Sequence, residues 1–358
     1  MSFEFPYWYD LHVHFRQGDD MQAYIQAHLD MKCAGALAMP NTKPPISRVL
    51  GNNTEDYWTI EAYRKMIGKA GGDQFEHFIV PLYLTKETTP AMIEEGAKSG
   101  LLQSCKYYPP HGTTNADFGA PMQHYIDTGV LQAMSDNNIV LNIHGEQHGM
   151  EAADYFDKDK NAEDYFYKNV MPQLVEKFPN LKIACEHITT KTAANFVQQT
   201  SDNIAATITP QHLLYTVGDL LKGCNYHLYC LPLVKFEEDR SALLNAIQSN
   251  NKDKFFAGTD SAPHHEKVTE CGCAAGCFTG EIAPQLYAQA FDLNEGNKDQ
   301  FEKFLCLNGP KFYGIKTSEK RFTLIKKETD VKVLKTTNKD IIPLPLGMGQ
   351  SKILWSIE

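Results

Sequence analysis

The chain has 358 residues, of which 42% are hydrophobic and 22% are charged, the balance of an ordinary globular protein. Its net charge of −10 at pH 7 excludes a broadly basic surface, so we expect no nucleic-acid partner. No apolar run approaches the roughly 18 residues that cross a membrane, and the first ten residues contain no Lys or Arg. Together with nine scattered cysteines, which we interpret as reduced thiols, these features predict a cytoplasmic protein without a membrane span or secretory signal.

Short apolar runs recur along the chain, and most are followed by a helical pattern. The predicted strands are 7–14, 35–39, 77–84, 101–107, 139–144, 181–187, 204–208 and 254–259. The predicted helices are 20–32, 54–70, 89–98, 121–136, 160–177, 190–199 and 239–249. Strands that alternate with helices close to eight times predict parallel pairing and a closed α/β fold, the TIM (β/α)₈ barrel. An open doubly wound sheet is the alternative, but no Gly-rich phosphate loop follows the first strand.

The pattern changes after about residue 280. Helices are predicted around 284–305, and short extended pieces follow at 321–326, 331–335 and 353–357. We therefore predict a catalytic barrel domain at 1–280 and a C-terminal appendage at 281–358, whose helices and short strands pack on the barrel.

Polar residues follow several of the predicted strands. In a barrel the loops after the strands converge on one face, where the chemistry takes place. His12 and His14 end the first strand, and alternate strand residues point the same way, so two imidazoles are aimed at one place. The other polar residues at or just after strand ends are Arg16, Asn41, Lys106, His144, His187, Asp260 and His264. Each has an ordinary structural explanation alone, but four histidines, a lysine and an aspartate at one barrel mouth predict a metal site.

The ligand types indicate which metal would bind. Imidazole and carboxylate without thiolate suit Zn²⁺ or a similar first-row ion. Four histidines and one aspartate exceed the roughly three protein ligands of a single catalytic zinc, so two metals would use them better. A lysine between two cations would lose its proton, and the neutral amine can add CO₂ to form a carbamate, which is an anionic bridge.

Eight motifs stand in a characteristic order over nearly the whole chain. They are HVHFR, MPNTKPP, CKYYP…TTN, HGE, EHITTK, ATITPQHL, YCLPLVK and GTDSAPH. In this order they resemble class II dihydroorotase, the bacterial-type, monofunctional enzyme of the amidohydrolase superfamily. The resemblance implies a TIM barrel of the metallo-dependent hydrolase type, a binuclear zinc site and a homodimer. It also implies the activity, which is reversible cyclisation of N-carbamoyl-L-aspartate to L-dihydroorotate and water in de novo pyrimidine (UMP) biosynthesis.

The resemblance also implies a role for each metal-site residue. His12, His14 and Asp260 would hold one zinc ion, and His144 and His187 would hold the other. N6-carboxylated Lys106 and a hydroxide would bridge the two ions. Asp260 would also shuttle the proton during catalysis.

Substrate contacts are implied in the same way. The substrate's α-carboxylate would be bound by Arg16, Asn41 and His264. Leu231 and an alanine of the Cys-rich loop would offer backbone groups to the ring, and Ala275 is preferred over Ala274. Thr113 and Thr114 would belong to a mobile active-site loop.

Several alternatives remain open at this point. A hydantoinase-like enzyme would keep the metal ligands but would not need Arg16, Asn41 and His264 together. A non-catalytic scaffold of this superfamily would typically have lost metal ligands, and all are present here. The motif HGE echoes the H-x-E of zinc deaminases, but no P-C-x-x-C follows it. The cluster of Cys271, Cys273 and Cys277 lacks an obvious fourth ligand for a structural zinc.

Overall fold

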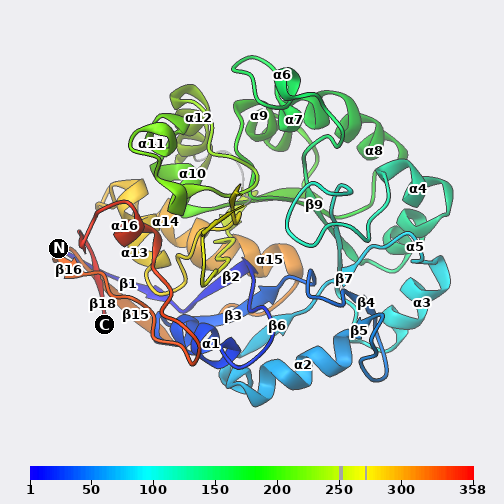
Figure 1. The fold of residues 1–358 in the computed structure, drawn as a ribbon, viewed down its shortest axis with the longest axis horizontal. Helices are drawn as coiled ribbons and strands as arrows, with labels where there is room; N and C mark the ends of the chain where they lie inside the picture. The colour runs from blue at the N-terminus through cyan, green and yellow to red at the C-terminus, as the bar shows by residue number, and fades with distance from the viewer. Residues whose placement is uncertain (250–252, 271) are drawn as a thin grey trace.

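In this computed structural model, which describes residues 1–249, 253–270 and 272–358, helices form a ring around a barrel of strands (Figure 1). The barrel strands are β2 (Trp8–Val13), β3 (Cys33–Ala38), β6 (His77–Ile79), β7 (Leu82–Tyr83), β8 (Ser104–Tyr107), β9 (Val140–His144), β10 (Ile183–Glu186), β11 (Ile204–Ile208) and β12 (Phe255–Ala257). Neighbours pair in parallel, and a parallel bridge between Val13 and Ser261 joins the first strand to the end of the last. The predicted closed barrel is therefore confirmed.

The third barrel strand differs from its prediction. The predicted strand 77–84 consists of two pieces, β6 paired with β3 and β7 paired with β8. Pro81 lies between them, and proline has no N–H to donate to a strand ladder. With β6 and β7 counted as one, the described residues form eight barrel strands.

Most ring helices begin within two residues of the predicted positions, but the helix predicted from residue 54 begins only at Ile60, after the short strand at Trp58–Thr59. The ring helices are α1 (Met21–Asp30), α2 (Ile60–Lys69), α3 (Pro90–Lys98), α4 (Met122–Asp127), α5 (Val130–Asp136), α7 (Ala162–Tyr165), η2 (Phe166–Val170), α8 (Met171–Lys177), α9 (Lys191–Gln199) and α12 (Glu237–Gln248). Threonine caps such as Thr59, Thr89 and Thr190 accept a backbone N–H from the first turn. The predicted helix 121–136 is split into α4 and α5 at Gly129, whose φ of 78° lies in the left-handed region.

Several short elements lie in the loops and were not predicted. They are β4 (Ile46–Arg48), β5 (Trp58–Thr59), η1 (Gly72–Gln74), α6 (Ala152–Tyr155), α10 (Pro210–Leu214), α11 (Val217–Leu221), η3 (Tyr226–Leu228), β13 (Val268–Thr269) and β14 (Gly272–Cys273). The hairpin of β13 and β14 belongs to the Cys-rich loop after the last barrel strand.

The C-terminal part begins with helices that pack on the barrel. These are α13 (Ala283–Phe291), α14 (Lys298–Glu302), η4 (Lys303–Leu307) and α15 (Asn308–Tyr313), and both η4 and α15 contact β2 and β12. The remaining elements are β15 (Arg321–Ile325), β16 (Thr329–Asp330), α16 (Leu344–Gly347), β17 (Lys352–Ile353) and β18 (Ser356–Ile357).

A small antiparallel sheet joins the two ends of the chain (Figure 1). Its central strand β15 pairs with β18 and with β1 (Ser2–Pro6), a strand that the sequence analysis did not predict. Residues 2–6 thus belong with the C-terminal sheet, while the helices after residue 281 cover the barrel. The division at residue 280 stays a prediction.

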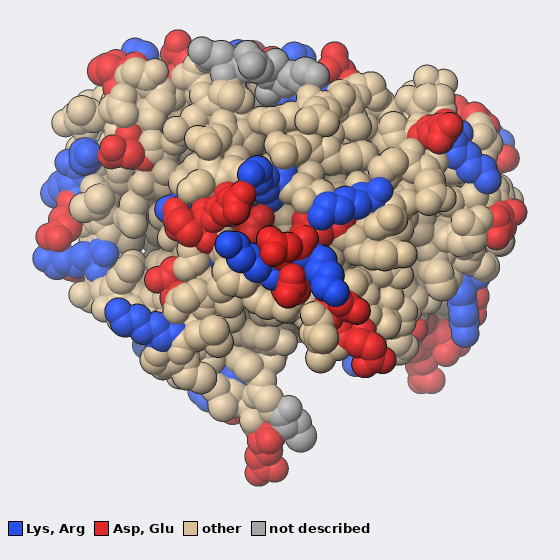
Figure 2. Space-filling view, turned by 90° about the horizontal axis from the view of Figure 1, so that it is seen from above, with Lys and Arg blue, Asp and Glu red and all other residues tan. Residues whose placement is uncertain are grey.

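The charges on the surface and the length and apolar character of the helices are relevant to which partners the protein can bind. On the face in Figure 2, acidic and basic side chains are interspersed on a largely uncharged surface. Among the described helices, none combines the length and the apolar character that a membrane crossing needs.

Candidate metal centre and active site

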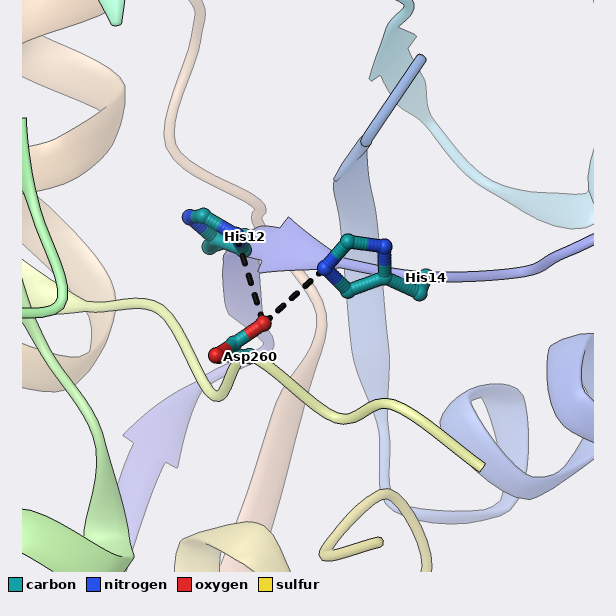
Figure 3. A group of neighbouring side chains, drawn as sticks. All are labelled: His12, His14 and Asp260. Carbon is teal, nitrogen blue, oxygen red and sulfur yellow. Dashed lines mark hydrogen bonds and ion pairs between the residues drawn. The ribbon is translucent and has the colours of Figure 1, made fainter. Parts of the chain in front are cut away.

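The ends of the first and last barrel strands bring three predicted metal ligands together. The Nε2 atoms of His12 and His14 lie 3.4 and 2.9 Å from the same Oδ1 of Asp260 (Figure 3). One potential ligand atom from each residue lies within 4.8 Å of the others, and all three side chains are buried. Two backbone hydrogen bonds hold this arrangement, from Asp260 N–H to the His12 carbonyl and from His14 N–H to the Ser261 carbonyl. The trio is therefore a candidate metal site.

A second pair of imidazoles lies beside the first site. The ring of His187 lies 4.8 Å from that of His144 and 4.9 Å from that of His12, centroid to centroid. The Nε2 of His144 is 2.7 Å from Glu146 Oε2, which leaves its Nδ1 for another partner. The buried Nδ1 of His187 has no hydrogen-bond partner among the described residues. His144 and His187 thus offer nitrogen atoms for a further ligand.

Lys106 lies inside the barrel close to both groups. Its side chain has no exposed surface, and within the described part of the chain its Nζ has no hydrogen-bond partner. Burial lowers the pKa of this amine to about 8, against the opposing charges of Glu186 and Asp260. An amine with a lowered pKa is neutral more often and can react with CO₂.

The residues present fit a metal ion of the zinc type. A buried ammonium and a buried imidazole nitrogen without partners are costly unless another group satisfies them. The donors that converge here are imidazole nitrogens, a carboxylate and an amine, the set that zinc and a lysine carbamate require. Among the residues that the structure describes, His12, His14 and Asp260 are the group whose ligand atoms already lie close together.

The electrostatic environment of Asp260 and His14 favours the deprotonated carboxylate and the neutral imidazole. Burial alone would raise the pKa of Asp260, but the hydrogen bond from His14 and the charges of His12, His14 and Lys106 lower it to about 2. Burial lowers the pKa of His14 to about 4. A carboxylate and a neutral imidazole are the forms that bind metals.

A pocket opens over these groups and contains most of the predicted substrate-binding residues. The predicted residues that line it are His12, His14, Arg16, Asn41, Thr113, Thr114, His144, His187, Leu231, Asp260 and Ala275.

His264 and Lys106 are not among the residues that line this pocket, but both contact its surroundings. The Nε2 of His264 lies 3.1 Å from Arg16 Nη2 and 2.8 Å from the Ala275 carbonyl oxygen. The Asn41 Oδ1 lies 2.9 Å from His14 Nδ1, and its amide nitrogen donates to the Thr114 carbonyl. Asn41 therefore links a metal-site histidine to the predicted mobile loop.

The structure places Ala274 and Ala275 differently with respect to the pocket. Ala275 lines the pocket, whereas the Ala274 carbonyl accepts a hydrogen bond from Lys267 outside it.

Cys271 lies outside the described residues. The thiols of Cys273 and Cys277 donate to different carbonyls, those of Tyr226 and His227. The two thiols thus have hydrogen-bond partners among the described residues.

Sequence reasoning missed four polar residues near the site. Glu186 accepts hydrogen bonds from Thr207 and Asn142, and it lies 2.6 Å from His12 Nδ1. Glu146 contacts His144, and Tyr108 lines the pocket. A signal was available for Asn142 and Glu186, since each is a polar residue within an apolar strand of a closed barrel, where only the interior or the helix layer can receive it.

Comparisons with known proteins support the same assignment. The chain is 40% identical to a dihydroorotase of Vibrio campbellii over 353 residues, which cover 98% of this chain and 97% of that protein. It is also 40% identical to a dihydroorotase of Shewanella putrefaciens, with the same coverage of both chains. No family model matches the chain.

Solved structures show the same fold. A dihydroorotase from Saccharomyces cerevisiae in complex with 5-fluoroorotic acid has a TM-score of 0.86 at 29% identity, covering 100% of this chain and 98% of that one. A dihydroorotase from Campylobacter jejuni has a TM-score of 0.82 at 30% identity, covering 100% and 97%. An L-hydantoinase from Arthrobacter aurescens has a TM-score of 0.75 at 14% identity, covering 99% and 83%, and shows the fold alone. With full-length relatives at 40% identity, the chain belongs to the dihydroorotase family of amidohydrolases.

Proposed function

We propose that this enzyme interconverts N-carbamoyl-L-aspartate and L-dihydroorotate at a binuclear zinc centre in the pocket above the barrel. The observation that carries the proposal is the convergence of four histidines, Asp260 and a buried lysine amine beneath a pocket, where that amine has no hydrogen-bond partner among the described residues. His12, His14 and Asp260 would hold one ion, and His144 and His187 the other. Lys106, carboxylated on Nζ, would lie between them.

Zinc bound here would polarise the ring amide carbonyl and lower the pKa of a water molecule enough for attack at neutral pH. Asp260 is placed to act as the proton shuttle. In hydrolysis it would take a proton from the attacking water and deliver it to the ring nitrogen as the C–N bond breaks. The products are a carboxylate, a ureido group and one proton that is released to solvent, and ring closure takes up that proton as it reverses these steps. His14, 2.9 Å from the Asp260 Oδ1, keeps the carboxylate oriented.

Substrate orientation would come from the cationic side of the pocket. Arg16 can bind a carboxylate through two parallel hydrogen bonds, which a lysine cannot do. Asn41 lines the pocket beside Arg16, and His264 contacts Arg16 from behind. Burial and the charge of Arg16 lower the pKa of His264 to about 3, so a neutral imidazole stands there. Leu231 and Ala275 would contact the ring through backbone groups.

A comparison of two substrates tests this function against a hydantoinase-like activity. The zinc-loaded enzyme should hydrolyse L-dihydroorotate and turn over dihydrouracil far more slowly, since dihydrouracil lacks the carboxylate that Arg16 would bind. Metal analysis of the same sample should give close to two zinc ions per chain. Equal turnover of both compounds would contradict the assigned specificity, and a metal-free, inactive protein would indicate a scaffold.

The resemblance to class II dihydroorotases supports two further proposals, a homodimeric assembly and a cytoplasmic location. Sedimentation equilibrium on the purified protein tests the first, and a single species with the mass of one chain would contradict it.

A further inference from the structure

A buried lysine joins two loops above the active-site pocket. The Nζ of Lys267 donates hydrogen bonds to the carbonyl oxygens of Tyr229, Ala274 and Gly276, at 2.9, 2.6 and 2.6 Å. The residue is only 8% exposed. An ammonium has three N–H donors and no acceptor, so these three carbonyls use its full hydrogen-bonding capacity.

The three carbonyls lie next to the backbone expected to contact the substrate ring. Tyr229 is two residues before Leu231, and Ala274 and Gly276 stand on either side of Ala275. Both Leu231 and Ala275 line the pocket. The two loops, residues 229–231 and 274–276, are far apart in the sequence, and Lys267 contacts both of them.

Backbone contacts place the second loop closely. The Gly276 N–H donates to the Tyr229 carbonyl at 3.0 Å, and the Ala274 N–H donates to the Lys267 carbonyl at 2.7 Å. Gly276 has a φ of 143°, and a Cβ there would lie 2.7 Å from the Ala262 Cβ. Only glycine suits this conformation and this close approach. In Figure 1 the yellow segment that carries these residues lies over the middle of the ring.

We propose that Lys267 is a positioning residue for substrate binding, which holds the loops 229–231 and 274–276 at the spacing that the substrate ring requires. This inference rests on the proposed function, because that function assigns the ring contacts to Leu231 and Ala275. Three carbonyl oxygens directed at one point repel each other electrostatically. The positively charged ammonium between them attracts all three and so compensates for this repulsion. Without the ammonium, the loops would separate or admit water, and each carbonyl would lose a buried charge-assisted hydrogen bond.

The expected kinetic effect is selective. We expect the backbone contacts of Leu231 and Ala275 to hold substrate and transition state alike. Losing such uniform binding raises KM and leaves kcat nearly unchanged. A purely structural role would lower stability without this selective change in KM.

The chain offers a matched control in Lys254. Its Nζ also donates to three carbonyls, those of Val197, Thr200 and Ser201, at 3.0, 2.6 and 2.7 Å. Lys254 is 3% exposed, and its side chain contacts the C-terminal end of α9, outside the active-site pocket. Lys254→Met therefore removes the same kind of contact without touching either substrate loop.

The test compares zinc-loaded wild type, Lys267→Met and Lys254→Met in hydrolysis of L-dihydroorotate, with Tm measured for each. Both variants should have a lower Tm. Lys267→Met should raise KM at least about tenfold with kcat within about threefold of wild type, while Lys254→Met should leave KM unchanged. An unchanged KM in Lys267→Met, or an equal rise in both variants, would overturn the proposal. If Lys267→Met does not fold, Lys267→Gln takes its place. Glutamine keeps two N–H donors, so this variant should raise KM above the wild-type value by less than the tenfold expected for Lys267→Met, and an unchanged KM would overturn the proposal.

Amide hydrogen exchange separates failure of this inference from failure of the proposed function. Wild-type enzyme that does not turn over dihydroorotate would contradict the function alone. The Gly276 N–H should still exchange faster in Lys267→Met than in wild type, and not in Lys254→Met. Unchanged exchange at Gly276 would overturn the positioning role whatever the substrate is.

Discussion

The Nδ1 of His12 lies 2.6 Å from the Oε2 of Glu186, and both side chains are buried. This contact joins the first barrel strand to the sixth across the interior. The same carboxylate accepts hydrogen bonds from Thr207 and Asn142, so its position is fixed by the barrel itself. Because the carboxylate holds a proton on Nδ1 of His12, Nε2 is left free to bind a metal.

Glu186→Gln should weaken zinc binding by roughly 10- to 100-fold, because a neutral amide holds the imidazole proton and orientation less strongly. Titration against a competing chelator measures this. Glu163→Gln is the matched control, since Glu163 is also a buried carboxylate but accepts its hydrogen bonds from Thr189 and Thr190. Equal zinc affinity in Glu186→Gln and wild type would show that the contact does not tune the ligand.

Lys106→Met should have opposite effects on stability and activity. In the metal-free protein it removes a buried ammonium that finds no hydrogen-bond partner in the described part of the chain, so the free energy of unfolding should rise by about 1–3 kcal/mol. In the zinc-treated enzyme it should abolish turnover and leave at most one zinc per chain. Denaturant unfolding in the presence of a chelator and metal analysis provide the two readouts. Full zinc content with normal turnover would exclude a bridging role for Lys106.

Asp260→Asn should lower kcat far more than it raises KM, because proton transfer takes place only in the transition state. Asp260 is also a proposed ligand, so zinc content must be measured in the same sample. Turnover at the wild-type rate would rule out the shuttle.

Replacing both Thr113 and Thr114 with Val tests the loop that faces the pocket. Valine keeps the shape and removes the two hydroxyls, so hydrogen bonds to a charged substrate would be lost. This loss should reduce transition-state stabilisation by about 2–5 kcal/mol, which lowers kcat/KM. Both residues are only half-buried, and the Asn41 contact uses the Thr114 carbonyl, so stability should change little. A loss of less than about tenfold in kcat/KM would mean that the loop is a connector.

Glu281→Gln should stabilise the protein at alkaline pH. Burial and the charge of Asp30 raise the pKa of Glu281 to about 7. A carboxyl whose pKa is raised on folding contributes stability below its unfolded pKa, and this is lost as pH rises through 7. The variant should therefore have a Tm about 1–3 °C above wild type at pH 8, allowing for its partial exposure, and no advantage at pH 4. Glu55→Gln, at an exposed loop position, is the control, and a pH-independent difference would contradict the assignment.

The alternation of apolar runs and helical patterns determined the barrel, because each strand of a closed parallel sheet must be buried on both faces and each helix on one. The polar residues at strand ends followed from the same pattern, since loops after parallel strands meet at one end. The resemblance supplied their roles, which remain proposals for all of the site residues.

Only the tertiary structure decided which groups meet across the barrel. Glu186 touches His12 from the opposite side, β1 pairs with β15, and Lys267 spans two loops. The contacts of Glu186 with His12, of β1 with β15 and of Lys267 with Tyr229 each join residues 38 or more positions apart. Local periodicity in the sequence carries no information about such distant pairs. Spacing in the sequence tells which way a side chain points from its own strand, whereas the partner it meets depends on how the whole sheet closes.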